Sequence, residues 1–191
     1  TRRYGDEAVR FIESHRDEPF FVYLPHSMPH VPLFRSPELV DHSRRGLFGD
    51  VIEEIDACVG GVLDTLRRLE LDGRTFVFFT SDNGPWLIFG RQGGSAGLLR
   101  AGKGSTGEGG MREPAIAWCP GRIPAGVVTA ELASTLDLLP TFAALAGAEA
   151  PTDRPLDGYD ISPLLLGNGP SPRESMLYYR GPRLMAARKG P

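Results

Sequence analysis

The chain has 191 residues, of which 41% are hydrophobic and 24% are charged, a composition typical of one globular domain with a real core. Its 21 basic residues are scattered against 24 acidic ones and give a net charge of −3, which excludes a nucleic-acid or membrane-surface patch. No run approaches the roughly eighteen apolar residues of a membrane span, no signal segment opens the sequence, and no pattern predicts an oligomeric state.

The first third of the chain predicts a helix, a buried strand and a loop. Residues 4–15 have a helical pattern that Glu18-Pro19 ends. The short apolar run FFVYL, residues 20–24, is typical of a strand inside a parallel sheet. A proline-rich loop, PHSMPHVPLF, follows this run and contains two histidines.

A long amphipathic helix begins near Asp50 and is followed by a second buried strand. Its apolar stripe steps by three and four residues through Ile52, Ile55, Val59, Val62, Leu66 and Leu69. TFVFFT, residues 75–80, is the strand. The order strand, helix, strand predicts an α/β fold with parallel pairing, in which functional sites gather beyond the carboxyl ends of the strands.

The second half of the chain is richer in glycine and proline. The expected elements are a glycine-rich loop over residues 90–110, a third strand over 114–119, a helix over 134–147 that Pro140 interrupts, and a loop over 151–172. A glycine-rich loop of this length in a compact domain is usually either functional or disordered. Near the end, the short runs MLYY and LMAA predict a pair of edge strands. We find no internal repeat.

The tripeptide Asp82-Asn83-Gly84 follows the second strand and has two interpretations. Asp-Asn-Gly is a common turn former, so it can simply end the strand. A carboxylate beside an amide carbonyl also offers the hard oxygen ligands that Ca²⁺ or Mg²⁺ prefer, although calcium takes about six to eight of them.

Other residues that could do chemistry lie in the loops. Lys103, in GKGST, could neutralise an anion, although the spacing does not match a P-loop. His26 and His30 are four residues apart in a loop, where an imidazole could contact an anion or protonate a leaving group. Each of the three can equally be an ordinary loop residue.

The remaining polar and aromatic candidates have structural interpretations. Glu108 and Arg112 could pair with each other, and Trp86 could form a wall of a cleft or a hydrophobic cover. Cys58 and Cys119 fall in apolar surroundings and are expected to be buried thiols outside any disulfide framework.

Taken in order, five segments of the chain resemble the formylglycine-dependent sulfatases, nearest to the branch of arylsulfatase A and N-acetylgalactosamine-6-sulfatase. The segments are PFFVYLPHSMPHVP, FVFFTSDNG, GKGSTGEGGMREPAIAWCPG, LASTLDLLPTFAALAG and LDGYDISPLLLG. The resemblance implies an alkaline-phosphatase-like sulfatase fold, α/β, with a mostly parallel sheet flanked by helices and incomplete at both ends. It implies that residues 1–191 are the middle-to-late portion of a single catalytic domain, with 173–191 leading into a truncated carboxyl-terminal sheet.

The resemblance also implies roles for individual residues. Asp82 and Asn83 match an Asp-Asn pair that holds Ca²⁺, Lys103 matches a lysine that contacts the substrate sulfate, and His30 matches a histidine at the sulfate or leaving oxygen, with His26 the less certain neighbour. The implied partner is a sulfate ester of an aryl, lipid or sugar alcohol. Relatives of this kind are lysosomal, secreted or periplasmic, which leaves the compartment of this chain open.

The sequence departs from the family at the nucleophile. The family makes formylglycine from the Cys of a C-x-P-[SA]-x-R motif, and neither that motif nor the accompanying Asp-Asp calcium pair is present in these 191 residues. We therefore expect an incomplete calcium shell and no turnover by this chain alone. Two alternatives to a sulfuric ester hydrolase remain: a phosphoester or phosphonate hydrolase of the same superfamily, which commonly needs extra His and Asp ligands, and a non-catalytic binding module.

Overall fold

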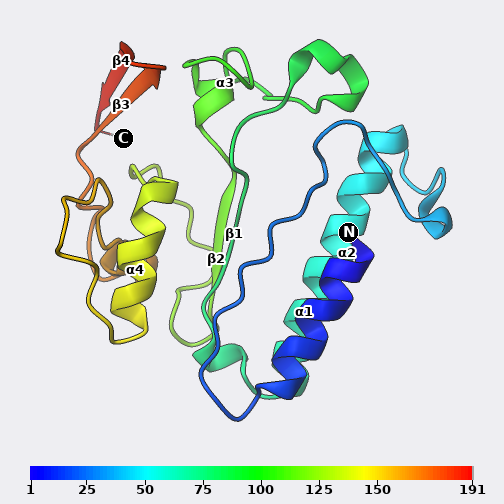
Figure 1. Cartoon of the computed structure of the whole chain (residues 1–191), viewed down its shortest axis with the longest axis horizontal. Coiled ribbons are helices and arrows are strands. Elements are labelled where there is room, and N and C mark those ends of the chain that lie inside the picture. The colour runs from blue at the N-terminus through cyan, green and yellow to red at the C-terminus, as the bar shows by residue number, and fades with distance from the viewer. Residues whose placement is uncertain (191) are drawn as a thin grey trace.

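Residues 1–190, which the computed structural model describes, are arranged in three layers (Figure 1). Helices α1 (Arg2–Ser14) and α2 (Gly46–Arg68) form one flank. Strands β1 (Val77–Thr80) and β2 (Ala115–Trp118) form the middle, and α4 (Leu138–Leu145) covers the other flank. The remaining elements are α3 (Glu108–Met111), α5 (Ser162–Leu165), β3 (Ser175–Arg180) and β4 (Arg183–Lys189). Pro191, the last residue of the expected 173–191 segment, lies outside the described residues.

Helix α2 packs against the middle layer through most of the predicted stripe. Leu66 is 1% exposed and forms a core cluster with Ile12 and Leu71, against which Phe20 and Trp118 pack. A second cluster is built by Leu33, Val51 and Ile55. Ile52 is the exception in the stripe because its side chain is 39% exposed. No helix of the described residues has the length and apolarity to cross a bilayer.

The pairing of the middle layer differs from the expectation. Strands β1 and β2 pair antiparallel, with Val77 opposite Trp118 and Thr80 opposite Ala115. The predicted strand over residues 20–24 is extended but joins no ladder within the described part of the chain. The expected mostly parallel sheet is therefore wrong for β1 and β2, and the parallel pairing of residues 20–24 with residues 75–80 is not formed within the described residues. The order strand, helix, strand does not identify which segment hydrogen-bonds to which.

The segment over residues 20–24 still packs in the middle layer, between the helices of the two flanks. Its side chains alternate, so that Phe20 and Val22 pack on the α2 side while Phe21 and Tyr23 are 70% and 79% exposed. The Phe142 ring, on α4, lies 6.1 Å from the Phe21 ring and 6.4 Å from the Phe78 ring. Helix α4 thus covers the face opposite α1 and α2, as Figure 1 shows.

The helix expected over 134–147 begins with a separate turn. A 3₁₀ turn covers Thr135–Asp137, capped by Ser134, and α4 follows directly with Pro140 in its first turn. Proline is tolerated there because the amide groups of a first turn have no partner within the helix. The predicted break is therefore a restart at Leu138.

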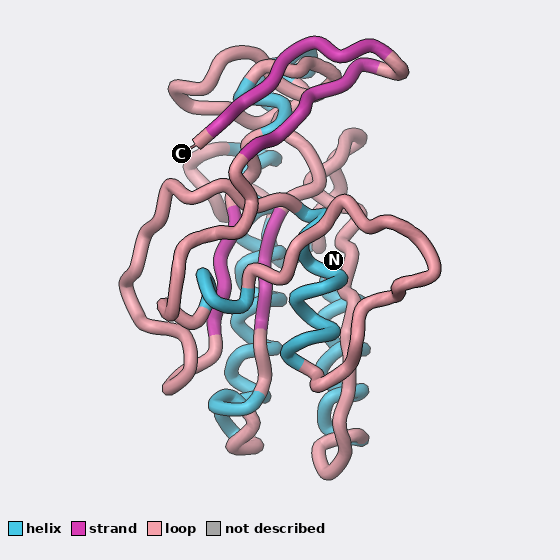
Figure 2. Tube along the Cα trace, turned by 90° about the vertical axis from the view of Figure 1, so that its left-hand side faces the viewer, coloured by secondary structure: helices cyan, strands magenta, loops and turns pink. Residues whose placement is uncertain are grey.

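The two short runs near the end of the chain pair as predicted. Strands β3 and β4 form an antiparallel hairpin with Ser175 opposite Lys189. Figure 2 shows this hairpin beyond the end of β1 and β2, as a sheet of its own. The loop expected over 151–172 contains the one-turn helix α5 and is otherwise irregular.

Candidate active site

Asp82 and Asn83 lie in the turn at the carboxyl end of β1. The Ser81 hydroxyl donates to the Asn83 carbonyl at 3.0 Å, and the Gly84 N–H donates to the Gly110 carbonyl at 3.3 Å. Gly84 is buried so closely that an added Cβ would lie 1.9 Å from the Gly109 carbonyl oxygen. The turn is therefore packed against the glycine-rich loop, and only glycine fits at its third position.

Lys103 is held by its backbone beside this turn. Its N–H donates to the Pro85 carbonyl at 2.9 Å, two residues after Asn83. Its ammonium nitrogen lies 5.2 Å from the centroid of the Trp86 ring, within the range of a cation–π contact. None of the ion pairs among residues 1–190 includes Lys103, so its charge is not neutralised by a carboxylate there.

His30 approaches the same indole from the proline-rich loop. The ring centroids of His30 and Trp86 are 5.6 Å apart, and His30 Nδ1 lies 2.7 Å from the Val31 carbonyl oxygen. A carbonyl can only accept, so Nδ1 carries the proton that it donates and Nε2 is left for another group. The structure thus brings His30, Trp86 and Lys103 together next to the Asp82-Asn83 turn.

His26 points elsewhere. Its Nε2 lies 3.6 Å from Cys58 Sγ on α2, and its ring centroid is 6.1 Å from that of Tyr4. Burial raises the pKa of the Cys58 thiol and lowers the pKa of His26, so both groups stay neutral near pH 7. Cys58 is only half-buried, whereas Cys119 is 1% exposed, and both are free thiols.

Glu113 is a further residue at this end of β1, and sequence reasoning missed it. Continuing the β1–β2 register past Thr80 and Ala115 places Asp82 opposite Glu113. Glu113 Oε1 is buried with no hydrogen-bond partner among the described residues. Burial, and then the charge of Asp82, raise the pKa of Glu113 to about 7. Only the antiparallel register of β1 and β2 could have indicated that Glu113 lies opposite Asp82.

The donor set near Asp82 is suited to a hard cation but is small. Asp82 and Asn83 offer a carboxylate and an amide oxygen, and calcium takes about six to eight oxygens. No group of three or more His, Cys, Asp or Glu side chains placed to hold a metal occurs within residues 1–190. Asp82 and Asn83 therefore fit one side of a calcium site, and these residues do not complete its shell.

The glycine-rich loop is tied to the end of the chain through Glu108. Its Oε2 lies 3.7 Å from Arg112 Nη1, which bears out the expected pair, and 3.3 Å from Arg188 Nη1 on β4. The one-turn helix α3 is therefore linked to the β3–β4 hairpin, which lies near it in Figure 1.

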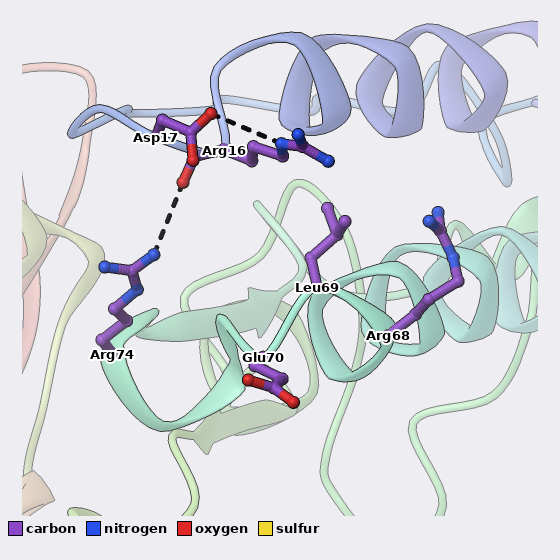
Figure 3. Close-up of a pocket in the computed structure, with 6 residues that line it drawn as sticks. All are labelled: Arg16, Asp17, Arg68, Leu69, Glu70 and Arg74. Carbon is purple, nitrogen blue, oxygen red and sulfur yellow. Dashed lines mark hydrogen bonds and ion pairs between the residues drawn. The ribbon is translucent and has the colours of Figure 1, made fainter.

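A pocket lies away from these residues. It has a volume of about 320 Å³ and lies where α1 and α2 end, as Figure 3 shows. Its lining consists of Arg16, Asp17, Arg68, Leu69, Glu70 and Arg74. None of the predicted site residues takes part in it, so this pocket is separate from the candidate site.

Comparison with known proteins finds sulfatases. The family model described as Sulfatase matches residues 1–148. Arylsulfatase A from Bos taurus is 53% identical over 165 residues, and N-acetylgalactosamine-6-sulfatase from Sus scrofa is 47% identical over 193 residues. These matches cover 86% and 100% of this chain, but the chain spans only about a third of each relative's length, 32% and 37%.

Solved structures agree with the family match. The PsFucS1 sulfatase from Pseudoalteromonas sp. superposes with a TM-score of 0.91 at 32% identity, over 97% of this chain and 38% of that one. A structure described as Ps i-CgsB in complex with k-i-k-neocarrahexaose superposes with a TM-score of 0.83 at 33% identity, over 94% of this chain and 42% of that one.

Proposed function

Because the chain belongs to the sulfatase family and has its alkaline-phosphatase-like fold, we propose that it supplies the sulfate-binding part of a sulfuric ester hydrolase active site. The observation that carries this proposal is the meeting of Lys103 and His30 at Trp86, beside the Asp82-Asn83 turn. In this proposal residues 1–191 are the middle-to-late portion of one catalytic domain, and residues 173–191 lead into its carboxyl-terminal sheet.

The chemistry of sulfate ester cleavage matches these side chains. Negative charge builds on the bridging oxygen and on the terminal sulfate oxygens as the ester bond breaks. The Lys103 ammonium donates to terminal oxygens. His30, with Nδ1 engaged by a carbonyl, can donate from Nε2 to the leaving oxygen when the ring is protonated.

Calcium is part of the proposal. Asp82 and Asn83 would hold it through one carboxylate and one amide oxygen, and a bound divalent cation would supply further stabilisation of negative charge. Since these are two of about six to eight ligands, we expect this chain to bind Ca²⁺ no more tightly than about 1 mM. Calorimetric titration with Ca²⁺ tests this, and an unchanged isotherm in Asp82→Ala would refute the assignment.

The nucleophile is not part of what this chain supplies. The formylglycine that the family uses is made from a motif absent from these 191 residues, so we expect purified chain to show no hydrolysis of an aryl sulfate. A turnover above that of a heat-denatured control would contradict this expectation.

Sulfate binding tests the proposal directly. Calorimetric titration of the chain with sodium sulfate should give a dissociation constant that rises at least about tenfold in Lys103→Ala, since hydrogen bonds to charged groups contribute about 1.5–3 kcal/mol. Lys189→Ala is the matched control because Lys103 and Lys189 are the only lysines of the sequence. Equal affinity in both variants, or tighter binding of phosphate than sulfate by the wild-type chain, would argue for another function.

A further inference from the structure

Trp86 contacts both of the side chains to which we assign sulfate binding. Its ring centroid lies 5.2 Å from Lys103 Nζ and 5.6 Å from the centroid of the His30 ring. The two contacts come from segments more than fifty residues apart in sequence, the proline-rich loop and the glycine-rich loop, which meet at the carboxyl end of β1. Trp86 is thus the side chain that contacts both the proline-rich loop, at His30, and the glycine-rich loop, at Lys103.

The indole is itself held in place. Trp86 follows Pro85, whose carbonyl accepts the Lys103 N–H at 2.9 Å. The Phe89 ring meets it edge-on at 4.7 Å, and the Phe89 N–H donates to the Trp86 carbonyl at 3.1 Å. Trp86 is therefore anchored on the backbone and at the ring before any ligand arrives.

An aromatic partner has a consequence that a carboxylate partner would not have. A carboxylate beside Lys103 would neutralise the ammonium and compete with an anionic substrate. The face of an indole attracts the ammonium through its quadrupole and leaves the full charge and the N–H donors available. An ammonium ordered in this way has lost much of its rotamer freedom in advance, and binding then costs less entropy.

We propose that Trp86 is a positioning residue, which holds the Lys103 ammonium and the His30 imidazole in one sulfate-binding arrangement without neutralising the lysine. The proposal rests on the proposed function and extends it to a residue that contacts the anion only through its neighbours. A structural cover would need only apolar bulk at this position, whereas a positioning role needs an aromatic face.

The two lysines of the sequence allow a spectroscopic test. Reductive methylation with ¹³C-formaldehyde keeps the charge of both lysines and gives one NMR signal for Lys103 and one for Lys189, beside that of the methylated α-amino group, and Lys103→Arg and Lys189→Arg assign the two lysine signals. An indole face 5.2 Å away should shift the Lys103 methyl signal upfield through its ring current, while Lys189 stays near its random-coil position. Trp86→Leu should abolish the shift and Trp86→Phe should retain part of it. Trp118→Phe, at the other tryptophan, should leave it unchanged.

Sulfate titration of the same samples completes the test. Loss of the cation–π contact should weaken sulfate binding at the Lys103 signal by about two- to fivefold in Trp86→Leu, with partial rescue in Trp86→Phe. A Lys103 signal at the same position in wild type and Trp86→Leu overturns the inference, as does equal sulfate affinity in the two. If the ring-current shift is present but sulfate moves no wild-type lysine signal, the proposed function fails first, and the inference falls with it. Far-ultraviolet circular dichroism of each sample reports whether the variant is folded.

Discussion

At the scale of single residues, the candidate site contains ionisable side chains that form no ion pair with each other. The Lys103 ammonium faces an indole, and Glu113 Oε1 is buried opposite Asp82 with no hydrogen-bond partner within residues 1–190. In a typical protein, buried charges are paired. Unpaired groups of both signs at one end of a strand are typical of a site that receives its partners from a ligand or a metal.

Glu113 gives a pH prediction. The pKa of its carboxyl is about 7 in the folded chain against an ordinary 4.5, so the folded state binds more protons than the unfolded state between these values. Its favourable contribution is full below pH 4.5 and is lost as the pH rises through 7. Without added divalent cations, Glu113→Gln should therefore raise Tm relative to wild type more at pH 8 than at pH 4.5.

The control for this change is Glu149→Gln, at an exposed position. Its Tm difference from wild type should be nearly the same at both pH values. Thermal denaturation followed by circular dichroism measures both variants, and a Glu113→Gln difference that does not grow with pH would contradict the placement of Glu113 beside Asp82.

At the scale of elements, a buried ion pair ties α4 to the region before β3. Asp137 is fully buried and accepts from Arg173 Nε at 3.0 Å and from the Tyr159 N–H at 2.9 Å. Arg173 is 8% exposed, and its hydrogen bonds to Asp137 raise its pKa. Three segments of the chain therefore meet at a single carboxylate.

Removing that carboxylate should be strongly destabilising. Asp137→Ala leaves Arg173 buried without its partner, which costs about 3–5 kcal/mol of unfolding free energy. Asp153→Ala is the matched control, because the Asp153–Arg154 pair is exposed and such pairs contribute at most about 1 kcal/mol. Urea denaturation measures both, and similar losses in the two variants would refute the role of the buried pair.

One leucine and one isoleucine of the α2 stripe, Leu66 and Ile52, should also differ in how much they contribute to the free energy of unfolding. Leu66→Ala removes a side chain that is 1% exposed and should cost about 2–5 kcal/mol, while Ile52→Ala, at 39% exposure, should cost much less. The same urea denaturation experiment compares them, and an Ile52 effect as large as that of Leu66 would mean that α2 is rotated about its axis from the orientation described.

Part of this architecture could be predicted from the sequence. The stripe from Ile55 to Leu69 and the edge hairpin were predictable because helical and strand periodicities are local. The antiparallel partner of β1 was not, because the connection between the two strands, residues 81–114, is long and includes the glycine-rich loop. Lys103, His30 and Asp82 could be selected as single residues. Trp86 as the common neighbour of Lys103 and His30, and Glu113 as the residue opposite Asp82, required the three-dimensional structure.

At the scale of the whole molecule, the chain is a segment of the sulfatase fold whose middle layer keeps exposed aromatic side chains. The PsFucS1 sulfatase shares its fold over 97% of this chain but only 38% of that one. Phe21 and Tyr23 project from the middle layer with 70% and 79% of their surface exposed. The site at the end of β1 is likewise partial, with two proposed calcium ligands and two proposed sulfate contacts.

The most direct measurement is a double-mutant cycle on sulfate affinity, with wild type, Lys103→Ala, His30→Ala and the double variant titrated with sodium sulfate. The account predicts that each single change weakens binding and that the double variant binds no more than about threefold more weakly than Lys103→Ala, since both side chains hold one anion. Wild-type affinity in His30→Ala, or fully additive losses, would contradict a single sulfate site at Trp86.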